Sequence, residues 1–125
     1  MTVAITARGR DLDAELDAGF GRAPFFVVVD SESERFSVHD NRRNIDLVGR
    51  AGVSAAGDIV RLGVNALITE RVGPRTFAVL KAGRVDVYVG ASGHVADAWG
   101  QFRRGELERI SAPTVQDHWT HVLDL

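Results

Sequence analysis

Five consecutive apolar residues constrain the fold of this chain more than any other feature of its sequence. Residues 25–29 read FFVVV, with aromatic and β-branched side chains at every position rather than at alternate ones. Such a segment is typical of a strand that is buried on both faces of a sheet. Helices on the two faces of a sheet provide this cover, so the segment favours a layered α/β fold.

The segments around this strand predict an ordered series of strands and helices. Strands are expected at residues 3–7, 25–30, 35–39, 66–69 and 85–89. Apolar residues at helical spacing predict three helices, which end near Gly63, Gly83 and Gly105. The order β-β-β-α-β-α-β-α predicts a five-stranded mixed sheet flanked by helices, with the first strand at its centre and residues 40–52 as a loop.

Length and composition indicate one globular domain. The chain has 125 residues, of which 45% are hydrophobic, and a formal net charge of −2. We assign residues 1–105 to the domain and residues 106–125 to a C-terminal tail. No apolar run approaches the roughly 18 residues that span a membrane, and the first residues do not resemble a signal peptide. A cytoplasmic protein without a membrane partner is therefore expected.

The composition also argues against several kinds of chemistry. The sequence contains no cysteine, which excludes disulfides, thiolate nucleophiles and cysteine-bound zinc or iron–sulfur centres. A net acidic charge, without interleaved basic and aromatic residues, argues against a nucleic-acid partner. The first predicted strand lacks the carboxylates of a two-metal nuclease, and no phosphate-binding loop or hydrolase motif occurs. We therefore expect a protein that is not an enzyme.

The predicted topology indicates where a ligand would bind. In open α/β sheets, ligands bind at the carboxyl ends of the parallel strands, where the connections diverge. Loops 8–24, 40–52, 70–75 and 90–94 should share this rim. They carry eight arginines, which are Arg8, Arg10, Arg22, Arg42, Arg43, Arg50, Arg71 and Arg75. Acidic residues on the same loops make the expected rim charged with both signs.

Two short segments of the rim carry most of the candidate binding residues. The stretch FGRAP leads into the buried strand, and the glycines Gly19 and Gly21 could permit positive φ and close approach of the backbone to a ligand. A tight turn without a ligand is the alternative. The second segment opens a helix, whose free amides and dipole attract anions. The candidate cofactor-binding residues are Gly19, Phe20, Gly21, Arg22, Ala23, Asn41, Gly73, Pro74 and Arg75.

Histidines are the candidates for direct metal coordination. His39 and His94 lie at the ends of two predicted strands, where either could ligate a metal, although solvated histidines are the alternative. His118 and His121 in the tail have i, i+3 spacing, which could hold a metal on a helix. The alternative for the tail is that Trp119 docks on the core and leaves both histidines exposed. We retain His39 and His94 as candidate metal ligands.

Three segments of the chain resemble a known family, the dinitrogenase iron–molybdenum cofactor-binding domain. They are residues 9–30, 49–89 and 95–107, within which FGRAP and VGPRTF are the most specific motifs. The resemblance, which includes NifX-like and orange-protein-like members, implies a ribonuclease-H-like layered fold. It also implies binding and carriage of a preformed anionic metal–sulfur cluster that contains molybdenum, either of the iron–molybdenum-cofactor type or a molybdenum/copper sulfide. Donor and acceptor proteins for the metallocluster would be the partners.

The chain departs from this family pattern at one informative position. In nitrogenase-associated members a histidine precedes the Phe-Gly of the first loop, and the matching residue here is Gly19. Together with the absence of cysteine, this departure favours a cluster held by electrostatics and backbone amides over direct coordination. The alternative function is a regulatory or protein-interaction domain that has kept the fold but binds no cluster.

Overall fold

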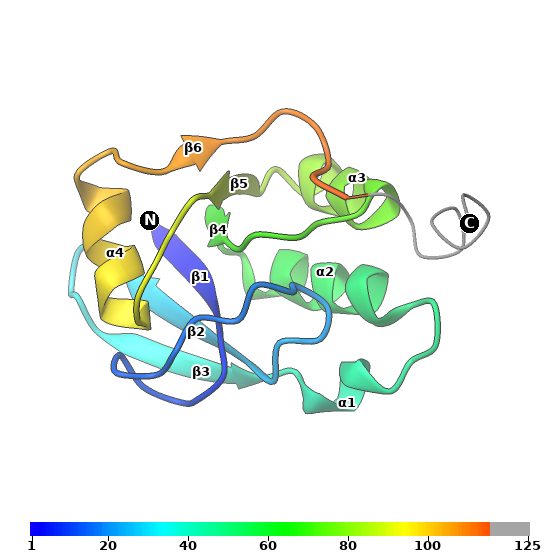
Figure 1. The fold of residues 1–125 in the computed structure, drawn as a ribbon, viewed down its shortest axis with the longest axis horizontal. Helices are drawn as coiled ribbons and strands as arrows, with labels where there is room; N and C mark the ends of the chain where they lie inside the picture. The colour runs from blue at the N-terminus through cyan, green and yellow to red at the C-terminus, as the bar shows by residue number, and fades with distance from the viewer. Residues whose placement is uncertain (116–125) are drawn as a thin grey trace.

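The protein folds as a six-stranded mixed sheet with helices on both faces (Figure 1). The structure is a computed structural model, and it describes residues 1–115. The strands are β1 (Thr2–Ala7), β2 (Phe25–Asp30), β3 (Phe36–Asp40), β4 (Ala66–Ile68), β5 (Asp86–Val89) and β6 (Glu108–Arg109). The helices are α1 (Arg42–Ile45), α2 (Ala51–Leu62), α3 (Pro74–Ala82) and α4 (Val95–Arg103).

The order of the strands places β1 in the interior of the sheet. The sheet order is β3-β2-β1-β4-β5-β6, in which β1 is parallel to β4 and β4 is parallel to β5. The hairpin of β2 and β3 is antiparallel and lies on the other side of β1. The mixed α/β architecture and the position of the first strand, both predicted from the sequence, are confirmed.

The predicted count of five strands is wrong. Strand β6 pairs antiparallel with β5, so that Tyr88 lies opposite Arg109 and Val89 opposite Glu108. A two-residue strand is too short to give an alternating pattern, and it falls inside the segment that we assigned to the tail. The expected loop 40–52 also contains the four-residue helix α1. The domain boundary at residue 105 and the ribonuclease-H-like classification stay predictions.

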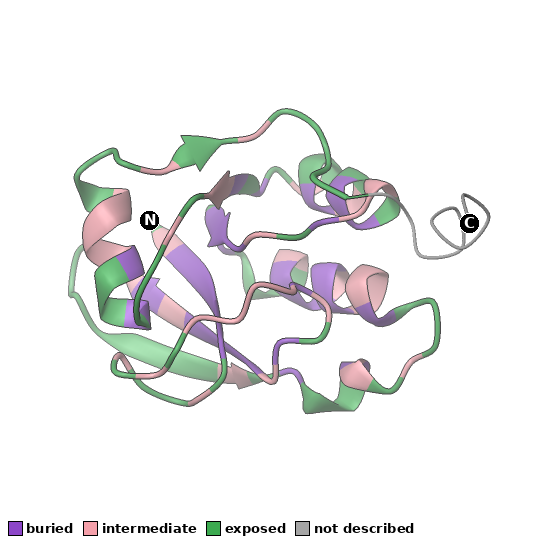
Figure 2. Cartoon of the chain, in the orientation of Figure 1, coloured by how far each residue is buried: buried purple, intermediate pink, exposed green. Residues whose placement is uncertain are grey.

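The run of five apolar residues is explained by two separate core layers. Phe26 faces α2 and α3 and belongs to a cluster with Ile59 and Leu80. Its neighbour Val27 points to the opposite face and belongs to a cluster with Val95 of α4. In Figure 2 the buried residues, in purple, lie along the central strands, with α4 on one side of the sheet and the pair α2 and α3 on the other. Burial of each such side chain stabilises the fold by about 1.5–3 kcal/mol.

The helices begin and end at residues that the sequence marks. Gly63 follows α2 with φ 74°, the left-handed conformation that favours glycine at this position. Pro74 occupies the first position of α3, where its missing N–H costs no helical hydrogen bond. Within residues 1–115, none of the helices combines the length and the apolar character needed to cross a membrane.

Candidate anion-binding site

An open pocket of about 1030 Å³ lies on the rim where β1 and β4 end. Its wall consists of the loop before β2, the loop before α2, the first turns of α2 and α3, and the segment that follows β4. The lining residues are Asp17, Gly19, Phe20, Gly21, Arg22, Leu47, Val48, Gly49, Ala51, Gly52, Val53, Arg71, Val72, Gly73, Arg75, Thr76 and Val115. The volume is many times the roughly 30 Å³ occupied by one water molecule in the liquid.

The FGRAP loop is fixed to the core by its phenylalanine. Phe20 is buried and its ring stacks on that of Phe26, with 5.3 Å between the ring centroids. The backbone on either side of it runs beside the segment after β4. There the Arg71 N–H donates to the Ala18 carbonyl at 2.9 Å, and the Phe20 N–H donates to the Arg71 carbonyl at 3.4 Å. Phe20 therefore anchors the loop, while its neighbours form the wall of the pocket.

The glycines of this loop do not use the left-handed conformation that the sequence allows. Neither Gly19 nor Gly21 has a positive φ. A Cβ atom on Gly21 would lie 2.6 Å from the Cα of Gly52 in α2. A Cβ on Gly52 would in turn lie 2.4 Å from Oγ1 of Thr76 in α3. Gly21 thus permits close packing of the loop on two helices, because no side chain fits between them.

The electrostatics of the pocket favour an anion. The helices α2 and α3 both begin at the pocket, and neither has a side-chain cap or an acidic residue in its first turn. The first amides of a helix have no partner within the helix, and they carry the positive end of its dipole. Arg22, Arg71 and Arg75 line the same pocket with exposed side chains, and among residues 1–115 the lining includes one carboxylate, that of Asp17.

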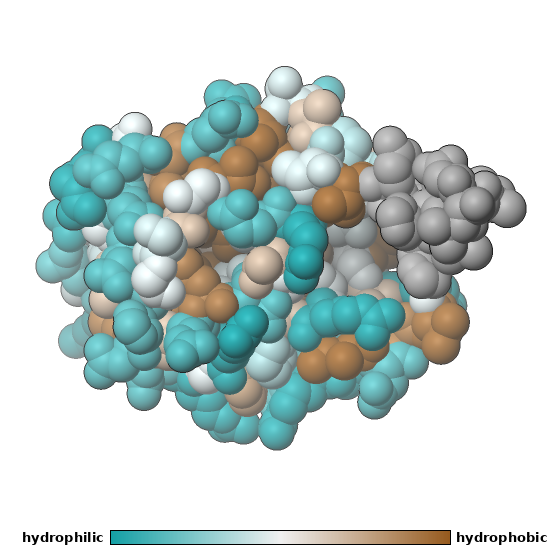
Figure 3. Space-filling model, in the orientation of Figure 1, coloured by the Kyte–Doolittle hydropathy of each residue, from teal (hydrophilic) through white to brown (hydrophobic). Residues whose placement is uncertain are grey.

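Two charged side chains of the pocket wall also make polar contacts with neighbouring residues. Asp17 accepts a hydrogen bond from the Gly19 N–H at 2.9 Å and lies 3.9 Å from Nε of Arg8. The Nη2 atom of Arg75 donates to the carbonyl of Gly49 at 3.2 Å. Gly49 itself has φ 71°, which turns the loop before α2 along the pocket. Figure 3 shows hydrophilic and apolar residues interspersed over the visible face of the molecule, and Val48 on the pocket rim is 93% exposed.

Of the nine candidate cofactor-binding residues, the structure brings six together at the pocket. These are Gly19, Phe20, Gly21, Arg22, Gly73 and Arg75. Pro74 lies beside them at the start of α3 but does not line the pocket. Ala23 is buried in the core cluster below the loop, and Asn41 is fully buried. Neither of these two side chains is placed to touch a ligand.

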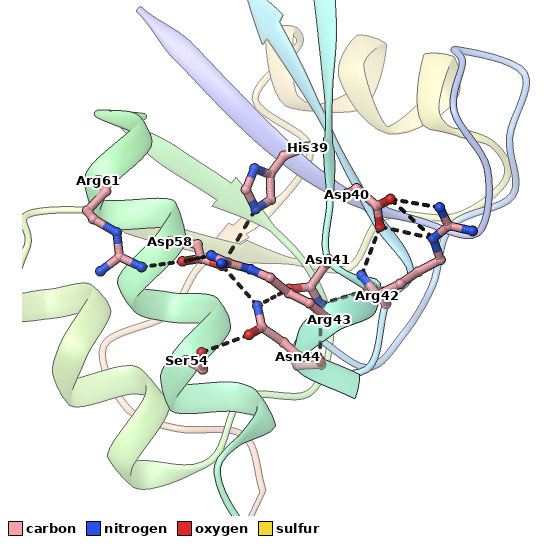
Figure 4. Close-up of polar contacts among 11 residues, drawn as sticks. His39, Asp40, Asn41, Arg42, Arg43, Asn44, Ser54, Asp58 and Arg61 are labelled. Atoms are coloured by element: carbon pink, nitrogen blue, oxygen red, sulfur yellow. Dashed lines mark hydrogen bonds and ion pairs between the residues drawn. The ribbon is translucent and has the colours of Figure 1, made fainter. Parts of the chain in front are cut away.

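Asn41 belongs instead to a buried polar network behind the pocket loop (Figure 4). Its Nδ2 donates to the carbonyls of Gly21 and Ala23, at 3.1 and 2.8 Å. Its Oδ1 accepts a hydrogen bond of 2.7 Å from Nδ2 of Asn44. The Nδ2 atom of Asn44 also donates to Oδ2 of Asp58 on α2, at 2.9 Å. A continuous chain of hydrogen bonds therefore connects α2 to the loop that lines the pocket.

Asp58 is the charged centre of this network. It is buried, and it accepts hydrogen bonds from the guanidinium groups of Arg43 and Arg61 as well as from Asn44. Burial alone would raise the pKa of the Asp58 carboxyl, but the hydrogen bonds from Asn44, Arg43 and Arg61 outweigh it, so the pKa lies below its ordinary value. The carboxylate is therefore ionised at neutral pH and acts only as an acceptor.

The two candidate metal ligands lie apart from the pocket and from each other. His39 on β3 stacks on Phe26, and its Nε2 atom lies 3.6 Å from Oδ2 of Asp58 without a hydrogen-bond partner among residues 1–115. His94 precedes α4, which covers the opposite face of the sheet, and its Nδ1 lies 3.4 Å from Oδ2 of Asp97. In the described part of the chain, no three His, Asp or Glu residues are grouped to hold a metal ion. His118 and His121 lie outside the described residues.

Sequence reasoning missed several residues of the pocket. Arg71 is one of the eight rim arginines but not one of the nine candidate binding residues, and only its position after a predicted strand points to it. Residues 47–49 lie in the loop 40–52 that the sequence places on the rim, but none of them is among the candidate binding residues. The first turn of α2 carries no specific signal, because Gly52 and Val53 are typical of any helix start. Several other rim arginines are paired instead, since Arg8 contacts Glu15, Arg42 contacts Asp40, and Arg43 contacts Asp58.

The fold and the site together define a small mixed α/β protein with an electropositive pocket at the carboxyl edge of its sheet. The chain belongs to the dinitrogenase iron-molybdenum cofactor family, whose model matches residues 1–105. An uncharacterized protein of Methanocaldococcus jannaschii is 29% identical over 100 residues, which cover 76% of this chain and 82% of that relative.

Two solved structures of similar proteins share the architecture. The apo form of the orange protein from Desulfovibrio gigas is 34% identical, with a TM-score of 0.88, and the match covers 91% of this chain and 96% of that one. A Thermotoga protein that is provisionally assigned to NifB is also 34% identical, with a TM-score of 0.80 over 91% of this chain and 97% of its own. The family predicted from the sequence motifs is therefore confirmed.

Proposed function

We propose that this protein binds a preformed anionic metal–sulfur cluster in the pocket and carries it between proteins, without catalysing a reaction. The observation that carries the proposal is the convergence of three arginines and two uncapped helix starts on one open pocket. Membership of the iron-molybdenum cofactor family supports a cluster as the cargo. The cluster would be of the iron–molybdenum-cofactor type or a molybdenum/copper sulfide, and its donor and acceptor proteins would be the partners.

The residues of the pocket fit an anionic cargo better than a bare metal cation. The pocket offers guanidinium groups and backbone N–H groups, which donate hydrogen bonds to sulfide or oxide ligands of a cluster. Among the lining residues that lie within residues 1–115, Asp17 is the one acidic side chain, and its Oδ1 already accepts a hydrogen bond from the Gly19 N–H. Binding would therefore hold the cluster through its outer anionic atoms and leave its metal ions without protein ligands from these residues.

Binding of tetrathiomolybdate tests this function directly. The purified protein should retain molybdenum and visible absorbance after gel filtration. Replacement of Arg22 by alanine should weaken binding about ten- to a hundredfold, because a charged hydrogen bond is typically worth ~1.5–3 kcal/mol. The Arg22 side chain is exposed, so the free energy of unfolding should change by less than about 0.5 kcal/mol. Arg35→Ala, at an exposed position before β3, is the matched control and should bind like the wild type.

The dependence of binding on salt separates electrostatic binding from coordination. Exposed charge contacts are screened over about 8 Å at physiological ionic strength, so the affinity should fall as salt rises. An affinity that is insensitive to salt, but is abolished by His39→Ala or His94→Ala, would contradict the proposal and indicate direct coordination. Failure of the wild-type protein to retain any molybdenum would favour the alternative of a regulatory domain without a cluster.

A further inference from the structure

One peptide group in the pocket loop is held in a fixed orientation by a buried side chain. The carbonyl of Gly21 accepts a hydrogen bond from Nδ2 of Asn41, which is fully buried behind the loop. The described chain contains no cis peptide bond, and in a trans peptide the C=O and the following N–H point in opposite directions. The N–H of Arg22 therefore points away from Asn41, in a segment where both Gly21 and Arg22 line the pocket.

This N–H group is available to a ligand. None of the residues 1–115 accepts a hydrogen bond from the amides of Gly21 and Arg22, whereas the amides of Gly19, Phe20 and Ala23 in the same loop all have acceptors. We propose that Asn41 is a positioning residue of the pocket, which turns the Gly21–Arg22 peptide so that the Arg22 N–H donates to the bound anion. This inference rests on the proposed function, and it assigns to Asn41 a role other than contact with the cluster.

The network behind Asn41 keeps its side-chain amide from rotating. Asn44 donates to Oδ1 of Asn41 and to the carboxylate of Asp58, and its own Oδ1 accepts a hydrogen bond of 2.7 Å from Oγ of Ser54. A flipped Asn44 would direct its oxygen at the carboxylate, and a flipped Asn41 would direct its oxygen at two carbonyls. Because both flips lose hydrogen bonds in a buried site, the orientation of the Gly21 carbonyl is determined by α2.

A purely structural role of Asn41 and a positioning role predict different effects when the side chain is removed. If the role is purely structural, removal lowers the free energy of unfolding but leaves the affinity of the folded protein unchanged. Loss of the positioning side chain lets the Gly21–Arg22 peptide rotate, so the folded protein loses one donor to the anion. No cation is removed, and the dependence of affinity on salt therefore stays as in the wild type.

The first measurement uses the wild-type protein and needs no substitution. In a titration with tetrathiomolybdate followed by ¹⁵N–¹H correlation NMR, the Arg22 amide should show one of the largest shifts of the loop. The Ala23 amide, which already donates to the Phe20 carbonyl at 3.4 Å, is the internal control and should move less.

The second measurement compares variants for affinity, salt dependence and thermal unfolding. Asn41→Ala should weaken tetrathiomolybdate binding roughly tenfold, with the slope of affinity against salt unchanged. Arg22→Ala should lower both the affinity and the slope, because it removes a cation but keeps the amide. Arg61→Ala removes one partner of Asp58 but leaves the hydrogen bonds that connect Ser54, Asn44 and Asn41, and it should bind like the wild type. If Asn41→Ala does not fold, Ser54→Ala, which removes the first of these hydrogen bonds, takes its place.

The outcomes separate this inference from the proposed function. If tetrathiomolybdate binds and moves other pocket amides but not that of Arg22, or if folded Asn41→Ala binds as tightly as the wild type, the inference is wrong and the function stands. If the wild-type protein retains no molybdenum and no amide signal shifts, both this inference and the proposed function are wrong.

Discussion

At the residue scale, the pocket depends on which arginines lack an acidic partner. Arg42 forms a bidentate contact with Asp40, with hydrogen bonds of 2.8–3.2 Å, and its positive charge is compensated where it lies. Arg22 makes no ion pair within residues 1–115. An arginine without a carboxylate partner presents its full set of donors to a ligand, which is why Arg22 is the residue whose removal should cost affinity but not stability.

The two glycines of the pocket loop provide a matched test of packing. Gly21→Ala should destabilise the fold by about 1–3 kcal/mol, because its Cβ would lie 2.6 Å from the backbone of Gly52. Gly19→Ala should be tolerated within about 0.5 kcal/mol, since its Cβ would be 3.6 Å from the nearest atom, Nη2 of Arg71. Urea denaturation measures both free energies of unfolding. Equal stabilities of the two variants would show that the contact with Gly52 relaxes without cost.

At the scale of elements, the chain after α4 forms a strap across the edge of the sheet. It contributes β6 and then places Ile110 against the core cluster on the α2 and α3 face. Further along, Oγ1 of Thr114 accepts from the Val72 N–H and donates to the Glu70 carbonyl, at 2.9 Å each. The strap thereby holds the segment that follows β4, which includes part of the pocket wall.

Truncation tests how much the strap contributes. A chain that ends at Gly105 should keep a cooperative thermal transition, because residues 1–105 supply almost all of both buried clusters. Its Tm should fall, and Ile110→Ala in the full chain should reproduce about 1–2 kcal/mol of that loss through the apolar area it exposes. Val48→Ala, at a position that is 93% exposed, is the control and should leave Tm unchanged. An unfolded or aggregated truncation would show that the domain extends beyond residue 105.

At the scale of the whole molecule, the buried carboxylate of Asp58 makes the free energy of unfolding depend on pH. The folded-state pKa of Asp58 is lowered, so it is below the unfolded value of about 3.9. A group with a lowered folded pKa stabilises the protein above its unfolded pKa. This contribution is lost as the pH falls through the folded pKa, because the unfolded state then binds the proton more readily.

Acid unfolding of a neutral variant measures this contribution. Asp58→Asn should lower the free energy of unfolding by about 1–3 kcal/mol at neutral pH, because Arg43 and Arg61 lose a charged acceptor. The difference from the wild type should shrink below about pH 4, where Asp58 itself becomes protonated in the unfolded chain. Asp86→Asn is an exposed control, whose ion pair with Arg109 at 3.5 Å should be worth little. A difference that does not vary with pH would show that Asp58 acts through packing alone.

The sequence by itself determined the architecture and the family of this protein. The apolar run of β2, the glycine after α2 and the proline at the start of α3 are local signals, since each depends on backbone preferences or on burial of a short segment. From these signals the strand order and the rim of the pocket follow by topology alone. For the same reason, the sequence alone predicts that Arg22 and Arg75 share one rim, and both line the pocket.

Only the tertiary structure decided which residues face the pocket and which support the loop behind it. Asn41 stands in the same rim segment as Arg42, yet it is buried and bonded to two loop carbonyls. Gly21 lines the pocket, and its lack of a side chain also lets the loop pack closely on Gly52 of α2. Both outcomes depend on contacts between segments far apart in the chain, where distances of a few tenths of an ångström and the pairing of buried donors with acceptors decide the arrangement. Such contacts produce no periodic pattern in a single sequence, so they cannot be predicted from it.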